Sequence, residues 1–157
     1  MTENNPIRKQ YNDLAKKINL PKFDDIDKEL ELSDLDETNF LLRAIIRRIA
    51  EKLDFCASML EENLQPDTSN LYAIHETRFF NEREKKAMYD LYSKLMELSR
   101  QSIEISLRND DNDSAEFIGI FLNEWKTIRE ELIGFVRQMR TSWKPELDIK
   151  EDLGYLG

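Results

Sequence analysis

The chain has 157 residues, of which 35% are charged and 40% hydrophobic, with only four glycines and four prolines. So few turn-forming residues argue against a β-sandwich or β-barrel, and the composition suits long helices with solvated outer faces. The net charge of −9 argues against a general nucleic-acid-binding protein, because duplex affinity comes largely from lysines and arginines at phosphates. We expect residues 1–157 to form one helical domain.

A short helix and an acidic linker are predicted first. Apolar residues from Ile7 to Ile18 recur at helical spacing after Pro6, which predicts a helix over residues 6–19. Residues 24–37 are crowded with Asp and Glu and lack the central glycine of a calcium-binding loop. We interpret this stretch as a solvated linker with room for one helical turn; an electrostatic docking site for a basic partner is the alternative.

Two longer periodic segments follow in the middle of the chain. The first carries apolar residues at intervals of three and four from Leu41 to Leu64 and ends before Pro66. The second covers residues 71–107, and its apolar stripe shifts near Phe80. Two interpretations therefore stay open for this segment, one continuous helix or a helix broken near residue 81.

The last long helix is predicted after an Asp-rich turn. Residues 113–116 have the spacing of a capping box, and an apolar stripe with intervals of three and four follows as far as Met139. Gly119 and Gly134 each cost roughly 1 kcal/mol relative to Ala inside a helix, so we interpret them as positions of close approach by another backbone. A backbone of the same chain is the favoured neighbour, and a partner subunit is the alternative. Residues 145–157 are a C-terminal tail with apolar residues suited to docking.

These elements predict an all-α fold, an up-and-down bundle of three long helices plus a short N-terminal helix. The fourth edge of such a bundle is either thin or supplied by a partner. No stretch of the sequence has the roughly 20 apolar residues of a membrane span, and the first residues do not resemble a signal peptide. We therefore expect a cytoplasmic protein that does not bind membranes.

The sequence offers little for catalysis or cofactor binding. His75 and Cys56 are the only residues of their types, so a paired-histidine metal site or a thiolate cluster cannot form within one chain. No glycine-rich phosphate loop is present either. We expect no catalytic residue, no metal and no cofactor; His75 is interpreted as a surface or helix-packing residue and Cys56 as a small buried hydrophobe.

The candidate interaction surface combines an apolar band with basic residues. Tyr89 and Tyr92 flank the main stripe of the second long segment together with Met96, and such a widened band suits a helix contacted on two sides. A generous intramolecular core is the alternative interpretation. Basic and aromatic candidates complete the predicted surface: Arg43, Arg47 and Trp143. Binding of nucleic acid through the arginines is disfavoured by the overall charge.

Part of the chain resembles a known family. Residues 84–95 read Glu-Lys-Lys-Ala-Met-Tyr-Asp-Leu-Tyr-Ser-Lys-Leu, and residues 98–105 read Leu-Ser-Arg-Gln-Ser-Ile-Glu-Ile before an acidic turn and another amphipathic helix. This is similar to the helical A domain of archaeal GINS subunits, over roughly residues 80–135, although Ser102 stands where the family pattern usually has Lys. The resemblance implies a non-enzymatic scaffold subunit that bridges components of the replication fork.

The leading hypothesis is a non-enzymatic helical interaction protein, a subunit or adaptor with a protein partner or a homo-oligomeric state. The rival hypothesis is a small-ligand-binding or catalytic bundle. It would use carboxylates such as Glu51 or Glu130 beside Arg47 or Arg129. Charges next to a core stripe are usually surface pairs worth little, so the rival requires that these carboxylates be buried in a pocket.

Overall fold

The structure is a computed structural model that describes residues 5–145, and these residues form helices without any β-strand. The predicted all-α class is confirmed. The predicted count of three long helices and one short helix is wrong, because the described part contains six α-helices and one 3-10 turn. In chain order they are α1 (Pro6–Ala15), α2 (Phe23–Leu30), η2 (Leu32–Asp34), α3 (Leu41–Leu64), α4 (Leu71–Phe79), α5 (Glu82–Arg108) and α6 (Asp111–Ser142).

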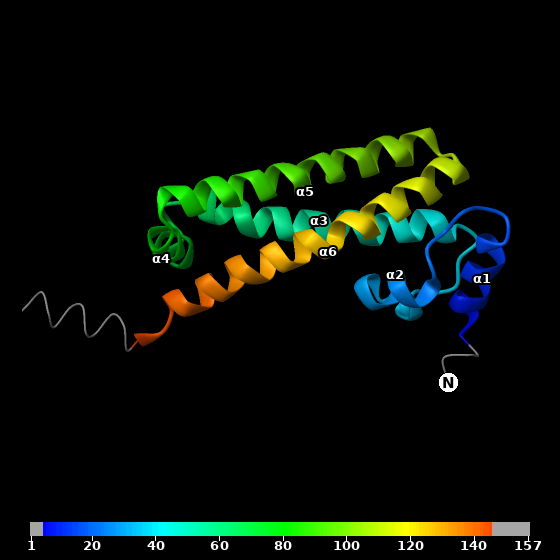
Figure 1. Cartoon of the computed structure of the whole chain (residues 1–157), viewed down its shortest axis with the longest axis horizontal. Coiled ribbons are helices and arrows are strands. Elements are labelled where there is room, and N and C mark those ends of the chain that lie inside the picture. Colours follow the sequence, from blue (N-terminus) through cyan, green and yellow to red (C-terminus); the bar gives the residue numbers. More distant parts are fainter. Residues whose placement is uncertain (1–4, 146–157) are drawn as a thin grey trace, which may run out of the picture.

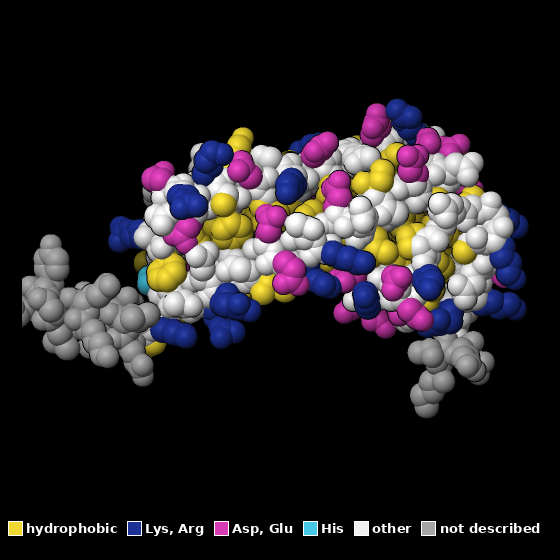
Figure 2. All heavy atoms as spheres, in the orientation of Figure 1, with side chains coloured by type: hydrophobic (Ala, Val, Ile, Leu, Met, Phe, Trp, Pro, Cys, Tyr) yellow, Lys and Arg dark blue, Asp and Glu magenta, His cyan; other side chains and the backbone are white. Residues whose placement is uncertain are grey.

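Three long helices form the body of the molecule. α3, α5 and α6 alternate in direction and lie side by side, with α1 and α2 at one end and α4 at the other (Figure 1). Hydrophobic side chains lie along the boundaries between the helices, and charged side chains cover their outer surfaces (Figure 2). Large side chains with less than 2% exposure fill the centre, among them Ile45, Ile49, Leu53, Leu60, Met88, Phe117 and Phe121.

The acidic stretch is folded, so the prediction of a linker over residues 24–37 is wrong for most of its length. Phe23, Ile26 and Leu30 recur at intervals of three and four and are buried, and Leu32 follows them into the core. All of the remaining positions of α2 except Lys28 carry acids, and the two acids in its first turn, Asp24 and Asp25, favour the positive end of the helix dipole. α2 is therefore an acidic amphipathic helix packed on the bundle.

α1 holds this N-terminal layer in place. It ends at Ala15, earlier than predicted, and the Asn5 side chain caps it by accepting from the Ile7 amide at 2.8 Å. The buried Tyr11 hydroxyl donates to the Pro21 carbonyl at 2.6 Å. Burial, and then the charge of Asp25, raises the pKa of Tyr11 well above its usual value, so the hydroxyl stays a donor.

Local hydrogen bonds decide where the last two long helices begin. The segment over residues 71–107 is broken, because Phe80 is extended and Asn81 starts α5. Asn81 and Glu84 form a capping box, with bonds of 2.8 and 3.0 Å between side chains and amides. The capping box predicted over residues 113–116 is wrong, since Asp110 caps α6 by accepting from the amide of Asp113 at 2.9 Å.

The favoured interpretation of Gly119 and Gly134, close approach by another backbone of the same chain, is wrong for the described residues, and close approach by a partner subunit stays a prediction. A Cβ atom built on either glycine would have no neighbouring atom within 4 Å, and neither glycine has a positive φ. Both positions therefore have room for a side chain in an ordinary helical backbone. The two glycines cost helix stability without serving the packing of the described residues.

We expect Gly119→Ala and Gly134→Ala each to raise the free energy of unfolding by roughly 0.5–1 kcal/mol. Alanine fits the backbone conformation of α6 and restricts the unfolded chain more than glycine does. Urea unfolding followed by circular dichroism measures the change. A loss of stability in either variant would show that its glycine is needed for a contact of α6.

Candidate interaction surfaces

α2 is attached to the bundle through a buried carboxylate. Glu29 is 7% exposed, and it accepts from Trp125 Nε1 at 2.9 Å and from the Arg129 guanidinium. Lys52 donates to the Glu29 carbonyl, and Arg48 donates to the Leu30 carbonyl at 3.2 Å. Cations from α3 thus meet the free carbonyls at the negative end of the α2 dipole, while α6 binds the Glu29 carboxylate.

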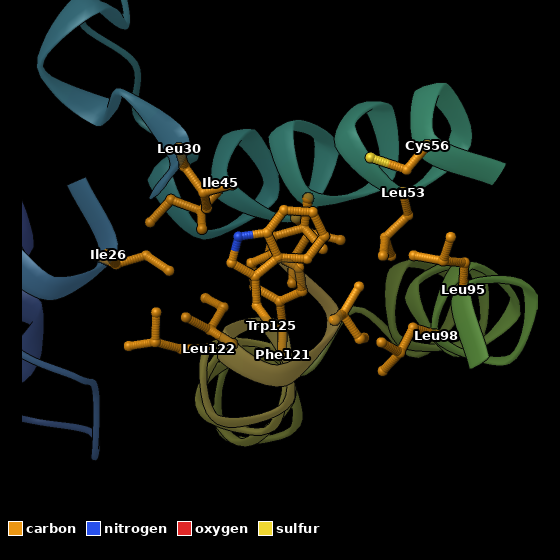
Figure 3. Packing of buried hydrophobic residues seen from close by; sticks show 14 of the residues in the cluster. Ile26, Leu30, Ile45, Leu53, Cys56, Leu95, Leu98, Phe121, Leu122 and Trp125 are labelled. Atoms are coloured by element: carbon orange, nitrogen blue, oxygen red, sulfur yellow. The ribbon is translucent and has the colours of Figure 1, made fainter. Parts of the chain in front are cut away.

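The apolar side of α2 enters the boundary between α3 and α6. Ile26 and Leu30 point toward Ile45 on α3 and toward Leu122 and Trp125 on α6 (Figure 3). α2 therefore takes the place of a fourth helix in the bundle. Since it has only eight residues, about 12 Å at 1.5 Å per residue, it covers only one end of the much longer α3 and α6.

The helix faces that bind α2 continue beyond it without a cover. On α3 the positions of Arg48 and Lys52 are followed, at intervals of three and four, by Phe55 and Met59. On α6 the stripe of Leu122, Trp125 and Arg129 is followed by Ile133 and Val136. We name these four apolar residues the open α3–α6 face: Phe55, Met59, Ile133 and Val136.

The exposed fractions of these side chains show that the open α3–α6 face is largely uncovered. Phe55 is 73% exposed, Ile133 and Val136 are each 42% exposed, and Met59 is partly buried. α3 and α6 run in the same direction at an inclination to each other (Figure 1), and Lys52 Nζ lies 5.1 Å from the centre of the Trp125 ring. Counted from this contact, Met59 and Ile133 lie seven and eight residues farther along their helices, whereas Phe55 lies three and Val136 eleven residues farther, so at about 1.5 Å per residue the open face extends over roughly 12 Å of the bundle.

α4 closes the far end of the bundle. Tyr72 donates to Glu62 at 2.8 Å, and this bond raises the pKa of the Tyr72 hydroxyl. His75 Nε2 lies 2.8 Å from the Ser142 carbonyl, and its ring stacks on Trp143 with centroids 4.0 Å apart. The helix-packing role predicted for His75 is confirmed, and Trp143 belongs to this end of the molecule.

The predicted interaction residues other than Trp143 lie on a second surface, between α3 and α5. Ser99 on α5 donates to Asp54 on α3 at 3.0 Å, which fixes the register of these antiparallel helices. A hollow of about 380 Å³ between the two helices is lined by Arg43 and Arg47 together with Ile103 and Leu107. We name this side of the bundle the α3–α5 face.

Tyr89, Tyr92 and Met96 lie farther along the α3–α5 face. The rings of the two tyrosines are 6.3 Å apart, Tyr89 is 58% exposed, and Tyr92 and Met96 are partly buried against the core. Five of the six predicted surface residues thus lie on one side of the bundle. Ile103 and Leu107 belong there too, and their helical spacing from Met96 was the signal that could have identified them.

The arginines of this face differ in their contacts. Arg43 Nε donates to Asn109 at 3.0 Å, and its guanidinium lies 4.8 Å from the centre of the exposed Phe40 ring. Arg47 is exposed and makes no hydrogen bond or ion pair with the residues that the structure describes. Arg47 is therefore available to an external carboxylate, whereas Arg43 already has partners within the chain.

The side chains proposed for the rival, catalytic hypothesis lie at the surface. Glu51 is exposed, and Glu130 is an exposed residue 3.9 Å from Arg129. Cys56 is buried as predicted; burial raises the pKa of its thiol, and the nearby Lys52 only partly opposes the effect. Among residues 5–145, no three His, Cys, Asp or Glu side chains are grouped to hold a metal ion.

Comparisons with protein-family models, curated proteins and solved structures found no match to this chain. The resemblance to the GINS A domain therefore stays a prediction. Of the helices in the described part, none combines the length and the apolar character needed to cross a membrane.

Proposed function

We propose that this chain is a non-enzymatic interaction protein that binds an acidic amphipathic helix of a partner on the open α3–α6 face. The observation that carries the proposal is the docking of α2. α2 is itself an acidic amphipathic helix, and the stripes that it contacts continue past its end with Phe55, Ile133 and Val136 exposed. In this proposal the partner's helix therefore resembles α2 in its acidic, amphipathic character and binds beside it.

The charges around the open face support an acidic ligand. Arg137 and Arg140 each follow a residue of the face by one helical turn, at positions four residues after Ile133 and Val136. Both arginines are exposed. A helix with carboxylates on its flanks would therefore find cations beside the apolar contact, as Glu29 finds Arg129.

The apolar side chains supply the binding energy in this proposal. Full burial of an exposed Phe, Ile or Val side chain contributes about 1.5–3 kcal/mol, although the part already buried in the free protein contributes nothing further. Helix-in-groove recognition generally depends on a few such anchors. Charge then selects an acidic partner among amphipathic helices.

The test begins with tagged full-length chain purified from its host cells. We expect Phe55→Asp and Val136→Asp to lose a partner that the wild-type chain retains, because each change places a carboxylate in the apolar contact. Tyr89→Asp, on the α3–α5 face, is the matched control and should retain that partner. Circular dichroism confirms that each variant is folded.

Direct binding measurements then test whether the partner segment is an acidic helix. Cross-linking identifies the partner segment at the open face, and a synthetic peptide of that segment is titrated into the purified protein. We expect an acidic, amphipathic segment whose affinity falls at least tenfold with Arg140→Glu. Equal binding by the wild-type chain and the Val136→Asp variant, or a basic segment at this face, would refute the proposal.

A further inference from the structure

The exposed apolar residues of α5 are arranged nearly symmetrically along the helix. Tyr89 and Leu107 lie nine residues on either side of position 98, and Tyr92 and Ile103 lie five or six residues on either side of it. Intervals of three and four keep all of them on one side of α5. A second α5 in the opposite direction would therefore set Tyr89 against Leu107 and Tyr92 against Ile103.

Charged residues of α3 are arranged symmetrically about the same point, beside position 98 of α5. Arg47, Asp54 and Glu61 follow one another at intervals of seven residues, so they lie on one side of the helix. The bond from Ser99 to Asp54 places the midpoint of this row beside position 98 of α5. Arg47 and Glu61, both exposed, thus lie at equal distances from one centre and carry opposite charges.

A twofold axis through this centre makes the α3–α5 face complementary to itself. Arg47 of each copy meets Glu61 of the other, and the apolar residues of the two α5 helices pair as above. Each Asp54 lies close to the axis, where two carboxylates would repel one another. Arg100, exposed and next to Ser99 on α5, supplies the opposite charge there.

We propose that the α3–α5 face binds a second copy of this chain and forms a twofold-symmetric dimer. Tyr89 of one copy enters the hollow of about 380 Å³ beside Ile103 and Leu107 of the other. The side chain is suited to this position, because its ring is exposed and its hydroxyl can meet the arginines at the rim. This inference is independent of the proposed function, which uses the other side of α3.

Analytical ultracentrifugation of the full-length chain over a range of concentrations tests the dimer. We expect the wild-type chain to dimerise at micromolar concentration and Arg47→Glu or Glu61→Arg to raise the dissociation constant at least tenfold. Each single change places like charges together at two symmetric positions. The double variant Arg47→Glu/Glu61→Arg restores opposite charges, so its dissociation constant should return to within about threefold of the wild-type value.

Val136→Asp, on the open α3–α6 face, is the control and should dimerise like the wild-type chain. Tyr89→Asp should be monomeric, with an unchanged circular dichroism spectrum. A wild-type chain that stays monomeric at 100 µM overturns the proposal, as does a double variant that associates no better than the single variants. A partner lost only with Phe55→Asp and Val136→Asp would leave the proposed function standing in either case.

Discussion

Glu29→Ala is expected to lower the free energy of unfolding by about 3 kcal/mol, since it removes the buried carboxylate of a partly exposed ion pair and leaves a buried indole without an acceptor. The lost carboxylate accepts from both Trp125 and Arg129. Loss of a buried partner usually costs 3–5 kcal/mol, and a value at the low end is expected because the Arg129 side chain is 42% exposed. Urea unfolding followed by circular dichroism measures the change.

Two variants separate this effect from a general sensitivity of α2. Glu29→Gln keeps an acceptor for Trp125 and should lose about half as much stability as Glu29→Ala. Asp25→Ala removes an exposed acid of the same helix and should change stability by less than about 1 kcal/mol. Equal losses of unfolding free energy in Asp25→Ala and Glu29→Ala would mean that any change in α2 lowers stability, and that the buried carboxylate has no special contribution.

The sequence predicted the long helices because their patterns are local. In α3 and α6 the intervals of three and four between apolar residues continue for many turns, and a proline follows each helix. α2 was missed because its three apolar residues are separated by charged and mostly acidic residues, and this high density of charge was given more weight than a short apolar periodicity. Phe23, Ile26 and Leu30 carried the correct signal, and only a partner surface could show that they are buried.

The start of α6 and the glycines show other limits of local reasoning. Asp110 and Asp113 are both good N-cap residues, and the choice between them depends on the turn after α5, which ends with Asn109 in the left-handed conformation. Gly119 and Gly134 were assigned a packing role from their cost to the helix. The space around them shows that neither glycine has a compensating contact within the described chain.

The candidate surfaces were predicted only in part, because exposure depends on tertiary structure. The widened apolar band of α5 drew attention to Tyr89, which is exposed, but the periodicity of α3 and α6 did not single out Phe55 and Val136. They are exposed because α2 is too short to cover them. Glu29 could not be paired with residues 96 and 100 positions away by any local rule.

Trp125→Ala is expected to lower the free energy of unfolding by about 4 kcal/mol, the usual range for a large buried aromatic side chain being 3–5 kcal/mol. The indole is 3% exposed, stacks on Phe121 with centroids 5.4 Å apart, and faces Lys52. It also donates to Glu29. Its loss leaves a cavity where α2, α3 and α6 meet, and hydrogen exchange should show faster opening of α2 than of α5.

A double-mutant cycle with Glu29 tests whether the indole acts through the carboxylate. Trp125→Phe keeps most of the packing and should cost about 1–2 kcal/mol through the lost hydrogen bond. Combined with Glu29→Ala, it should cost at least about 0.5 kcal/mol less than the sum of the two single changes, because both remove the same bond. Strict additivity would mean that Trp125 stabilises the docking of α2 by packing alone, and apolar shape would then outweigh charge in the choice of a helix for the open α3–α6 face.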